Sequence, residues 1–191
     1  MELKTYVHES LVKLQELGID VMEAEQEIAD SILGFPEDML NDMEPEQILG
    51  IILSGVGARV PSKIYAFDVE MDEIEQMYTV FFDELSRITD GELEITNVDE
   101  EISQEMLEAG TGTRMVRFMC NGKTYQYEAE FQYDWFDAGI LIFLNQVIGQ
   151  QDTDRRLYVT TDGYQCCILF YQNEEWAQRF RELFHMELKQ A

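Results

Sequence analysis

The sequence is poor in the residues from which metal sites and disulfide frameworks are usually built. Its 191 residues include 3 cysteines, 2 histidines and 3 prolines. A structural zinc ion takes about four N, S or O ligands, and the sequence has no Cys-x-x-Cys pair to supply them. Three cysteines do not make a disulfide framework either, so we interpret them as small buried apolar residues. We therefore predict neither a metal site nor a cofactor.

Catalytic motifs are missing as well. His8 and His185 lie near opposite ends of the chain, and no Gly-x-Ser-x-Gly motif is present. The Gly-x-Gly at residues 55–57 lacks the third glycine of a dinucleotide fingerprint, because position 60 is valine and Pro61 follows it. These absences predict a protein that is not an enzyme.

Long apolar runs are also absent. The longest candidates, residues 139–144 and 166–171, are far shorter than the roughly 18 apolar residues that a membrane span requires. The first ten residues show no basic region leading into an apolar one, so no secretory signal is visible. The sequence predicts a cytoplasmic protein that does not enter a membrane.

Acidic residues, by contrast, are abundant. The chain has 39 Asp and Glu against 13 Lys and Arg, a formal net charge of −26, and residues 1–110 alone carry 28 acidic against 5 basic residues. A field of this sign repels nucleic acid and anionic lipid, and it attracts a basic protein at a rate that falls with salt. An acidic surface also keeps a protein in solution, so charge by itself leaves that simpler interpretation open.

Helical spacing of apolar residues dominates the first third of the chain. Leu11, Leu14 and Leu17 fall on one helical face before Gly18, and Pro45 suits the first turn of a later helix. We predict a helical N-terminal part over residues 1–60 and an α+β domain over residues 61–191. One continuous domain is the alternative.

Two hairpins are predicted in the second part. Asn121-Gly122 joins two alternating runs and favours a type I′ turn, in whose register Phe118 faces Tyr125 and one face of the hairpin is aromatic and aliphatic. Asp162-Gly163 predicts the second loop, with Leu157 on the same face as Ile168. The expected fold is α+β: a helical N-terminal part followed by a mainly antiparallel sheet built from the two hairpins, with helices packed on one face.

The clearest helix covers residues 74–88, where Asp72 and Glu75 resemble a capping pair at its start. Another feature is the cluster Tyr-Asp-Trp-Phe-Asp at residues 133–137, between a strand and a helix. Its aromatic residues are interpreted either as a hot spot for a partner or as a staple that packs the helix start against the sheet. We expect the Trp135 ring to be mostly buried, because large aromatic residues at such junctions usually belong to the core.

The candidate partner-binding residues are Asp134, Trp135 and Asp137, together with Asp72 and Glu73. Over residues 64–188, the order and the amino-acid sequences of several segments resemble those of small acidic bacterial proteins of the polymorphic-toxin immunity type. The segments that carry the resemblance are YAFDVEM, MYTVFFDELSRITDGE, NGKTYQYEAEFQYDWFD, LNQVIG, RRLYVTTDGYQCCILFY and EWAQRF. The resemblance assigns no residue a role. It implies a non-enzymatic protein that binds and neutralises a cognate toxin, often a basic nuclease.

The alternative function comes from a different class. A small-molecule-binding regulatory domain would need a pocket between the sheet and the helices, and Tyr125, Tyr127 and Phe131 are the residues expected to line it. A deep apolar pocket with a few convergent polar groups would favour that function, whereas a solid core beneath an acidic surface would favour a protein partner.

Overall fold

Two antiparallel sheets and the helices around them make up the fold of the computed structural model, which describes residues 3–21, 24–36, 39–40 and 42–191. The helices are α1 (Leu3–Glu16), α2 (Glu25–Leu33), α4 (Pro45–Gly57), α5 (Met77–Ile88), α6 (Gln104–Ala109), α7 (Gly139–Ile148) and α8 (Glu174–Phe184), with a 3-10 turn, η1 (Ile74–Gln76), before α5. The strands are β1 (Tyr65–Asp68), β2 (Ile95–Glu101), β3 (Gly112–Cys120), β4 (Lys123–Phe131), β5 (Arg156–Thr161), β6 (Cys166–Gln172) and β7 (Lys189–Gln190).

The predicted α+β class is confirmed, with a helical N-terminal part followed by antiparallel sheet structure. The two hairpins lie in separate sheets, however, where the sequence suggested one. One sheet has four strands in the order β1-β6-β5-β7, and the other has three in the order β2-β3-β4. The β3–β4 hairpin pairs with the preceding strand β2, whereas the β5–β6 hairpin pairs with β1, about a hundred residues earlier in the chain. Pairing of that kind leaves no local signal in the sequence.

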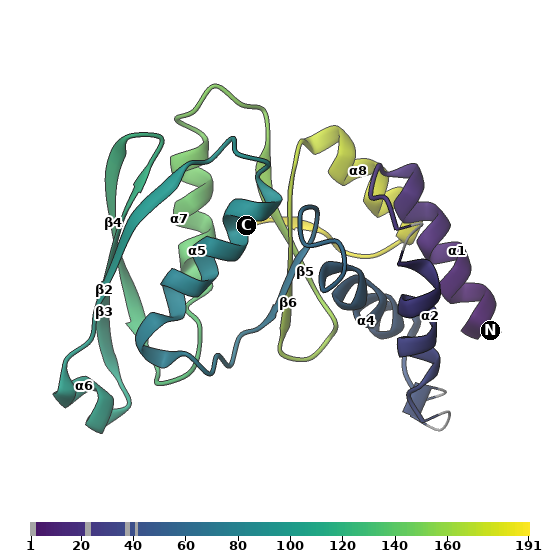
Figure 1. Cartoon of the computed structure of the whole chain (residues 1–191), viewed down its shortest axis with the longest axis horizontal. Helices are drawn as coiled ribbons and strands as arrows, with labels where there is room; N and C mark the ends of the chain where they lie inside the picture. The colour runs from purple at the N-terminus through teal and green to yellow at the C-terminus, as the bar shows by residue number, and fades with distance from the viewer. Residues whose placement is uncertain (1–2, 22–23, 37–38, 41) are drawn as a thin grey trace.

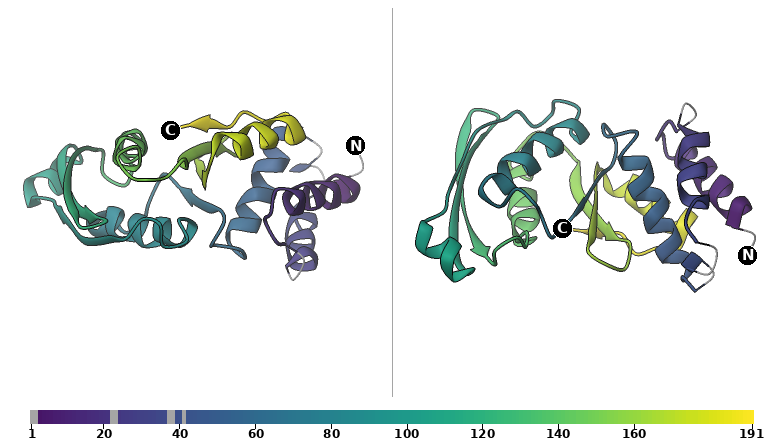
Figure 2. Two further views of the ribbon diagram at one scale, coloured as in Figure 1. Left: turned by 90° about the horizontal axis from the view of Figure 1, so that it is seen from above. Right: turned by 60° about the horizontal axis from the view of Figure 1, so that its bottom comes forward.

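The sheets and helices alternate in layers along the long axis of the molecule (Figures 1 and 2). Helices α1, α2, α4 and α8 pack on one face of the four-stranded sheet, and α5 and α7 lie between its other face and the three-stranded sheet. The four-stranded sheet is therefore covered on both faces, whereas the prediction had helices on one. None of the helices that the structure describes is both long and apolar enough to cross a bilayer.

The first hairpin, β3–β4, has the register that its turn dipeptide predicts. Phe118 pairs with Tyr125 and Cys120 with Lys123, and Asn121 and Gly122 have φ of 48° and 76°, as a type I′ turn requires. The predicted inward face is buried too, since Val116 and Phe118 belong to the core that α5 and α7 share with this sheet.

The predicted register of the second hairpin, β5–β6, is wrong. Thr161 pairs with Cys167 and Leu157 with Tyr171, so five residues, 162–166, lie between the last paired residues, three more than in a simple Asp-Gly turn. The shift between the two registers is odd, and an odd shift moves side chains to the opposite face. Leu157 consequently shares its core with Leu169 and Tyr171, while Ile168 faces the core around α1 and α4. The prediction had placed Leu157 and Ile168 together.

The N-terminal helices have no core of their own within the described part of the chain. Leu11 and Ile52 belong to one cluster with Ile168 and Phe170 of β6 and Phe180 of α8. A hydrogen bond from Trp176 Nε1 to the carbonyl oxygen of Leu17, at 2.8 Å, adds a polar link between α8 and the end of α1. The division at residue 60 stays a prediction, but side chains on both sides of it pack together.

The N-terminus of α5 is capped from the three-stranded sheet. The sequence favoured Asp72 and Glu75 as the capping pair, yet no side-chain cap comes from the residues before the helix. Glu100 of β2 takes that role, because its carboxylate accepts hydrogen bonds from Tyr78 N–H at 3.2 Å and Thr79 N–H at 2.9 Å. A carboxylate at a helix N-terminus satisfies free N–H groups and complements the helix dipole.

Candidate partner-binding surface

The chain turns back on itself directly after β4. Trp135 N–H bonds the carbonyl oxygen of Gln132 at 3.1 Å, and Tyr133 inside this turn has a φ of 54°. A left-handed backbone costs an L-residue about 1–2 kcal/mol. Backbone strain of this kind persists where the surrounding structure demands it, and it is concentrated at functional sites.

The returning segment pairs with the residues that follow β1. Met71 N–H bonds the carbonyl oxygen of Asp134 at 2.7 Å, and Phe136 N–H bonds that of Val69 at 2.7 Å. These two bonds flank an antiparallel bridge between Glu70 and Trp135, so the side chains of Glu70 and Trp135 lie on one face of the ribbon. Two stretches that are more than 60 residues apart in the sequence are thereby fixed side by side.

The ring of Trp135 is not mostly buried, so that prediction is wrong. Its exposed fraction is 45%, and that of the neighbouring Tyr133 is 48%. Phe136 takes the core position that the staple interpretation gave to both aromatic residues: it is 5% exposed and its ring lies 4.8 Å from that of Phe81. The alternation along the ribbon turns Phe136 inward and Trp135 outward.

The two paired segments that carry the exposed aromatic residues also carry several carboxylates. Glu70, Asp72 and Glu73 are exposed and Asp134 is half-buried. We call Glu70, Asp72, Glu73, Tyr133, Asp134 and Trp135 the acidic–aromatic patch. Within the described residues, none of its four carboxylates forms an ion pair with a Lys, Arg or His side chain. The sequence explains why: no Lys or Arg occurs between Lys63 and Arg87 or between Lys123 and Arg155.

Four of the five predicted partner-binding residues meet in this patch: Asp72, Glu73, Asp134 and Trp135. Asp137, the fifth, points its carboxylate into the molecule. One of its oxygens accepts hydrogen bonds from Tyr127 Oη and Glu130 N–H, each at 2.9 Å, and the other accepts from Gly139 N–H at 2.8 Å. Asp137 thus connects β4 to the start of α7. The hydrogen bond and charge of this carboxylate, added to burial as the main cause, raise the pKa of Tyr127.

The aromatic residues that the alternative function assigned to a pocket contact other side chains instead. The Tyr125 ring stacks on Phe118 at 5.8 Å, and the Tyr127 ring lies 5.3 Å from that of Phe143. Phe131 is buried and lies beneath the guanidinium group of Arg114, at 5.1 Å from ring centre to carbon. These three residues therefore support the core of the three-stranded sheet.

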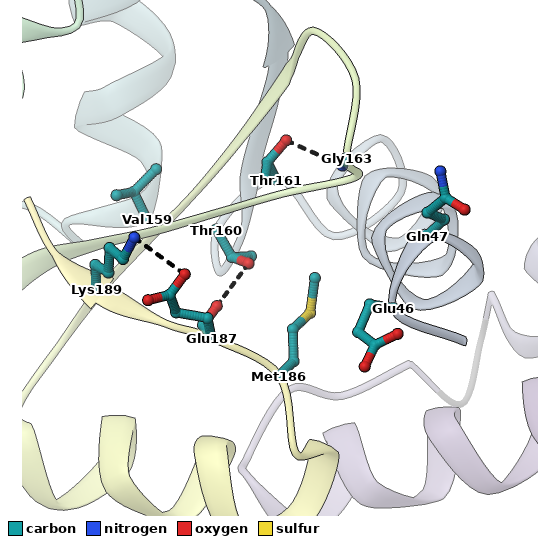
Figure 3. Close-up of a pocket in the computed structure, with 9 residues that line it drawn as sticks. All are labelled: Glu46, Gln47, Val159, Thr160, Thr161, Gly163, Met186, Glu187 and Lys189. Atoms are coloured by element: carbon teal, nitrogen blue, oxygen red, sulfur yellow. Dashed lines mark hydrogen bonds and ion pairs between the residues drawn. The ribbon is translucent and has the colours of Figure 1, made fainter. Parts of the chain in front are cut away.

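A pocket of about 300 Å³ does lie between the first turn of α4, β5 and the segment before β7 (Figure 3). Several polar groups at its wall are already paired with one another. Thr160 Oγ1 donates to the carbonyl oxygen of Glu187 at 2.8 Å, Lys189 Nζ lies 3.0 Å from the Glu187 carboxylate, and Gly163 N–H donates to Thr161 Oγ1 at 3.1 Å. A ligand site needs free polar groups that converge on the ligand, and these groups have partners.

Sequence reasoning missed one member of the patch, Glu70, and it included Tyr133 only as part of the aromatic cluster at residues 133–137. The long stretches without Lys or Arg were a usable signal, because carboxylates in such stretches have no cation nearby in sequence. In the described part of the chain, no group of three or more His, Cys, Asp or Glu side chains is arranged to hold a metal ion. Comparison of the chain with protein-family models, with curated proteins and with solved structures finds no match.

Proposed function

We propose that this protein binds a basic protein partner through the acidic–aromatic patch. The observation that carries the proposal is the exposed Trp135 ring, held in place by backbone hydrogen bonds between two segments that also carry carboxylates without ion-pair partners. Tryptophan is the residue most enriched in binding hot spots, and a one-signed field around it speeds the encounter with an oppositely charged protein.

The more specific proposal is that the partner is a basic toxin, which the protein neutralises by covering its active surface. Its support is the resemblance to proteins of the polymorphic-toxin immunity type and the net charge of −26. If this is right, the partner stops growth when a host cell expresses it alone and does not when this protein is expressed with it. Growth arrest that persists during co-expression would leave a binding function without neutralisation.

The test of binding begins with capture on the immobilised whole chain, identification of the bound protein by mass spectrometry, and kinetics by surface plasmon resonance. We expect a partner of net positive charge. Its association rate should fall steeply from about 0.1 M to about 1 M salt, over which the Debye length shrinks from about 10 Å to about 3 Å. A neutral or acidic partner, or an association rate independent of salt, would contradict the proposal.

Two variants separate the patch from the overall charge. Asp72→Lys with Glu73→Lys should slow association much more than Glu9→Lys with Glu16→Lys, which makes the same charge change on exposed positions of α1. Trp135→Ala should mainly speed dissociation and raise Kd by about thirtyfold, the equivalent of about 2 kcal/mol for a hot spot. Equal effects of the two charge-reversed pairs would place the interface elsewhere.

A further inference from the structure

Strand β1 has one free edge. It pairs with β6 on one side and ends the sheet on the other. Val69 N–H bonds the carbonyl oxygen of Gln165 at 3.0 Å. Because backbone groups of successive residues point to opposite edges of a strand, the N–H and C=O groups of Tyr65 and Phe67 point toward β6. The N–H and C=O groups of Ala66 and Asp68 therefore point away from the sheet, and no backbone hydrogen bond reaches them within the described residues.

A groove runs along this free edge. Its volume is about 570 Å³, and all four residues of β1 contribute to its lining. Ala58 at the end of α4 and Ile51 in its middle line one side, while Glu84 and Arg87 of α5 line the other. Helices α4 and α5 thus extend past the last strand on both faces of the sheet. One further strand placed beside β1 would lie between the same two helix layers that cover β1 itself.

The other sheet edges carry features that hinder pairing, and β1 carries fewer of them. Strand β2 has an irregularity between Thr96 and Asp99 that breaks its ladder, and β7 is two residues long. Strand β4 carries charged residues along its edge, among them Glu128 and Glu130. Natural proteins blunt exposed edges with such bulges, charges and short strands. In β1 the sequence Tyr-Ala-Phe is regular and uncharged until Asp68.

The charge of the groove selects the occupant. Of the described residues that line it, Asp68, Asp162 and Glu84 are acidic and Arg87 alone is basic, and Arg87 lies 2.7 Å from Glu84 in an ion pair. An added strand therefore meets excess negative charge, which favours Lys and Arg side chains. A second copy of this chain fits poorly, because β1 has no cation to offer and each copy carries a net charge of −26.

We propose that a basic partner inserts an extended segment, with Lys or Arg alternating with small apolar residues, as a fifth strand antiparallel to β1. This inference rests on the proposed function and names the element that the partner supplies. Asp68 lies two residues from Glu70 of the acidic–aromatic patch, so one partner can contact both. Main-chain hydrogen bonds provide affinity in such strand addition, and the side-chain positions provide specificity.

The test uses a displayed library of random peptides of about ten residues, which at about 3.3 Å per residue is ample for a short strand. Selection on the immobilised whole chain should enrich peptides in which Lys or Arg alternates with apolar residues. Their affinity, measured by fluorescence anisotropy, should fall about tenfold or more for Ala58→Trp, which fills the groove from an exposed position. Ala109→Trp, at an exposed position on α6, is the matched control and should leave it unchanged.

N-methylation of the selected peptide tests the main-chain pairing directly. Two peptides are compared, one methylated on the amide nitrogens of the odd-numbered residues and one on those of the even-numbered residues. One of them should lose binding and the other should keep it, because only one edge of the peptide forms hydrogen bonds with β1. No enrichment, equal loss in both peptides, or equal binding to Ala58→Trp would overturn the proposal.

The outcome for the groove is separate from that for the patch. A basic protein whose binding is weakened by Trp135→Ala and is indifferent to Ala58→Trp would preserve the proposed function and reject the fifth strand. Weakening by both variants would support one continuous interface. Peptide binding at the groove without capture of any basic protein would reject the proposed function and, with it, the partner named here.

Discussion

The two hairpins of this protein are fixed by different means. The β3–β4 hairpin has a two-residue turn whose Asn121 is hydrogen-bonded to Glu92 and Glu94, just before β2. Its base is tied to the fold where Arg114 of β3 meets Glu100. The β5–β6 hairpin has five residues between its last paired positions, and Asp162 among them lies against α4 at Gly50. Its tip is held by another element, and its register is set by that contact as much as by its own turn.

The difference explains why one register could be read from the sequence and the other could not. A dipeptide with positive φ at both positions dictates pairing only when it is the whole loop. Asp162-Gly163 supplies one positive φ, 83° at Gly163, inside a longer connection. There the carboxylate of Asp162 accepts hydrogen bonds from Tyr164 N–H at 2.9 Å and Cys166 N–H at 3.3 Å. Side-chain bonds and helix contact, rather than the turn type, place β6 opposite β5.

The base of the first hairpin should be the most sensitive point. Arg114 and Glu100 are 1% and 5% exposed and 2.8 Å apart, and the guanidinium group lies between the rings of Tyr78 and Phe131. Glu100→Ala leaves a buried cation without its partner and should cost about 3–5 kcal/mol of unfolding free energy in urea titrations. Asp99→Ala breaks an exposed pair with Arg117, which solvent and salt screen, and should change the unfolding free energy very little. Similar losses in the two variants would show that the buried pair does not anchor the hairpin.

The tip of the second hairpin comes next in expected effect. A Cβ atom on Gly50 would lie 2.3 Å from the Asp162 Cα atom, so Gly50→Ala should force α4 and the loop apart and cost about 1–3 kcal/mol. Gly55→Ala in the same helix meets only Ile28 at 3.8 Å and should stabilise by about 0.5–1 kcal/mol, as alanine does inside a helix. Thermal unfolding of both variants gives the comparison. Two shifts of the same sign would contradict a tip held by α4.

The smallest effect is a pH dependence to which two tyrosines of the second hairpin contribute, alongside other buried tyrosines such as Tyr127 of the first hairpin. Burial raises the pKa of Tyr158 and of Tyr171 to about 12, against an ordinary value of about 10. Below pH 10 these tyrosines are protonated in both the folded and the unfolded chain, so the full stability is present. Above it the unfolded chain ionises first, so stability falls as pH rises through 10 to 12. The urea midpoint should drop between pH 8 and pH 11, and the drop should be smaller in Tyr171→Phe. Tyr164 is 64% exposed, so Tyr164→Phe should show the same drop as the unchanged protein. If Tyr164→Phe reduced the drop as much as Tyr171→Phe does, the effect would belong to tyrosines in general.

Local signals predicted local structure well. The helices that begin near Pro45 and near residue 77 and the whole β3–β4 register follow from capping, periodicity and turn chemistry. The partition into two sheets, the odd register of β5–β6 and the capping of α5 by Glu100 depend on pairings between distant segments. Those pairings leave no pattern in the local sequence, and they become visible only in the folded chain.

The candidate site shows the same limit. The sequence located Asp134 and Trp135 but oriented the tryptophan ring inward, because the segment that turns it outward, residues 69–71, lies more than 60 residues earlier. Asp137 was chosen for its charge, yet its oxygens are occupied by Tyr127, Glu130 and Gly139. Composition places charge in a region, and only tertiary contacts decide which carboxylates remain free for a partner.

The stretches without Lys or Arg also have a chemical consequence. Carbodiimide joins a carboxylate to an amine with no spacer, and residues 64–86 and 124–154 contain carboxylates but no lysine. Coupling within these stretches is therefore suppressed, and an amide formed on Glu70 or Asp72 would have to come from an amine elsewhere. The same stretches contain no trypsin site, so a cross-linked peptide from this surface would be long, acidic and easily separated from the short basic peptides of its partner.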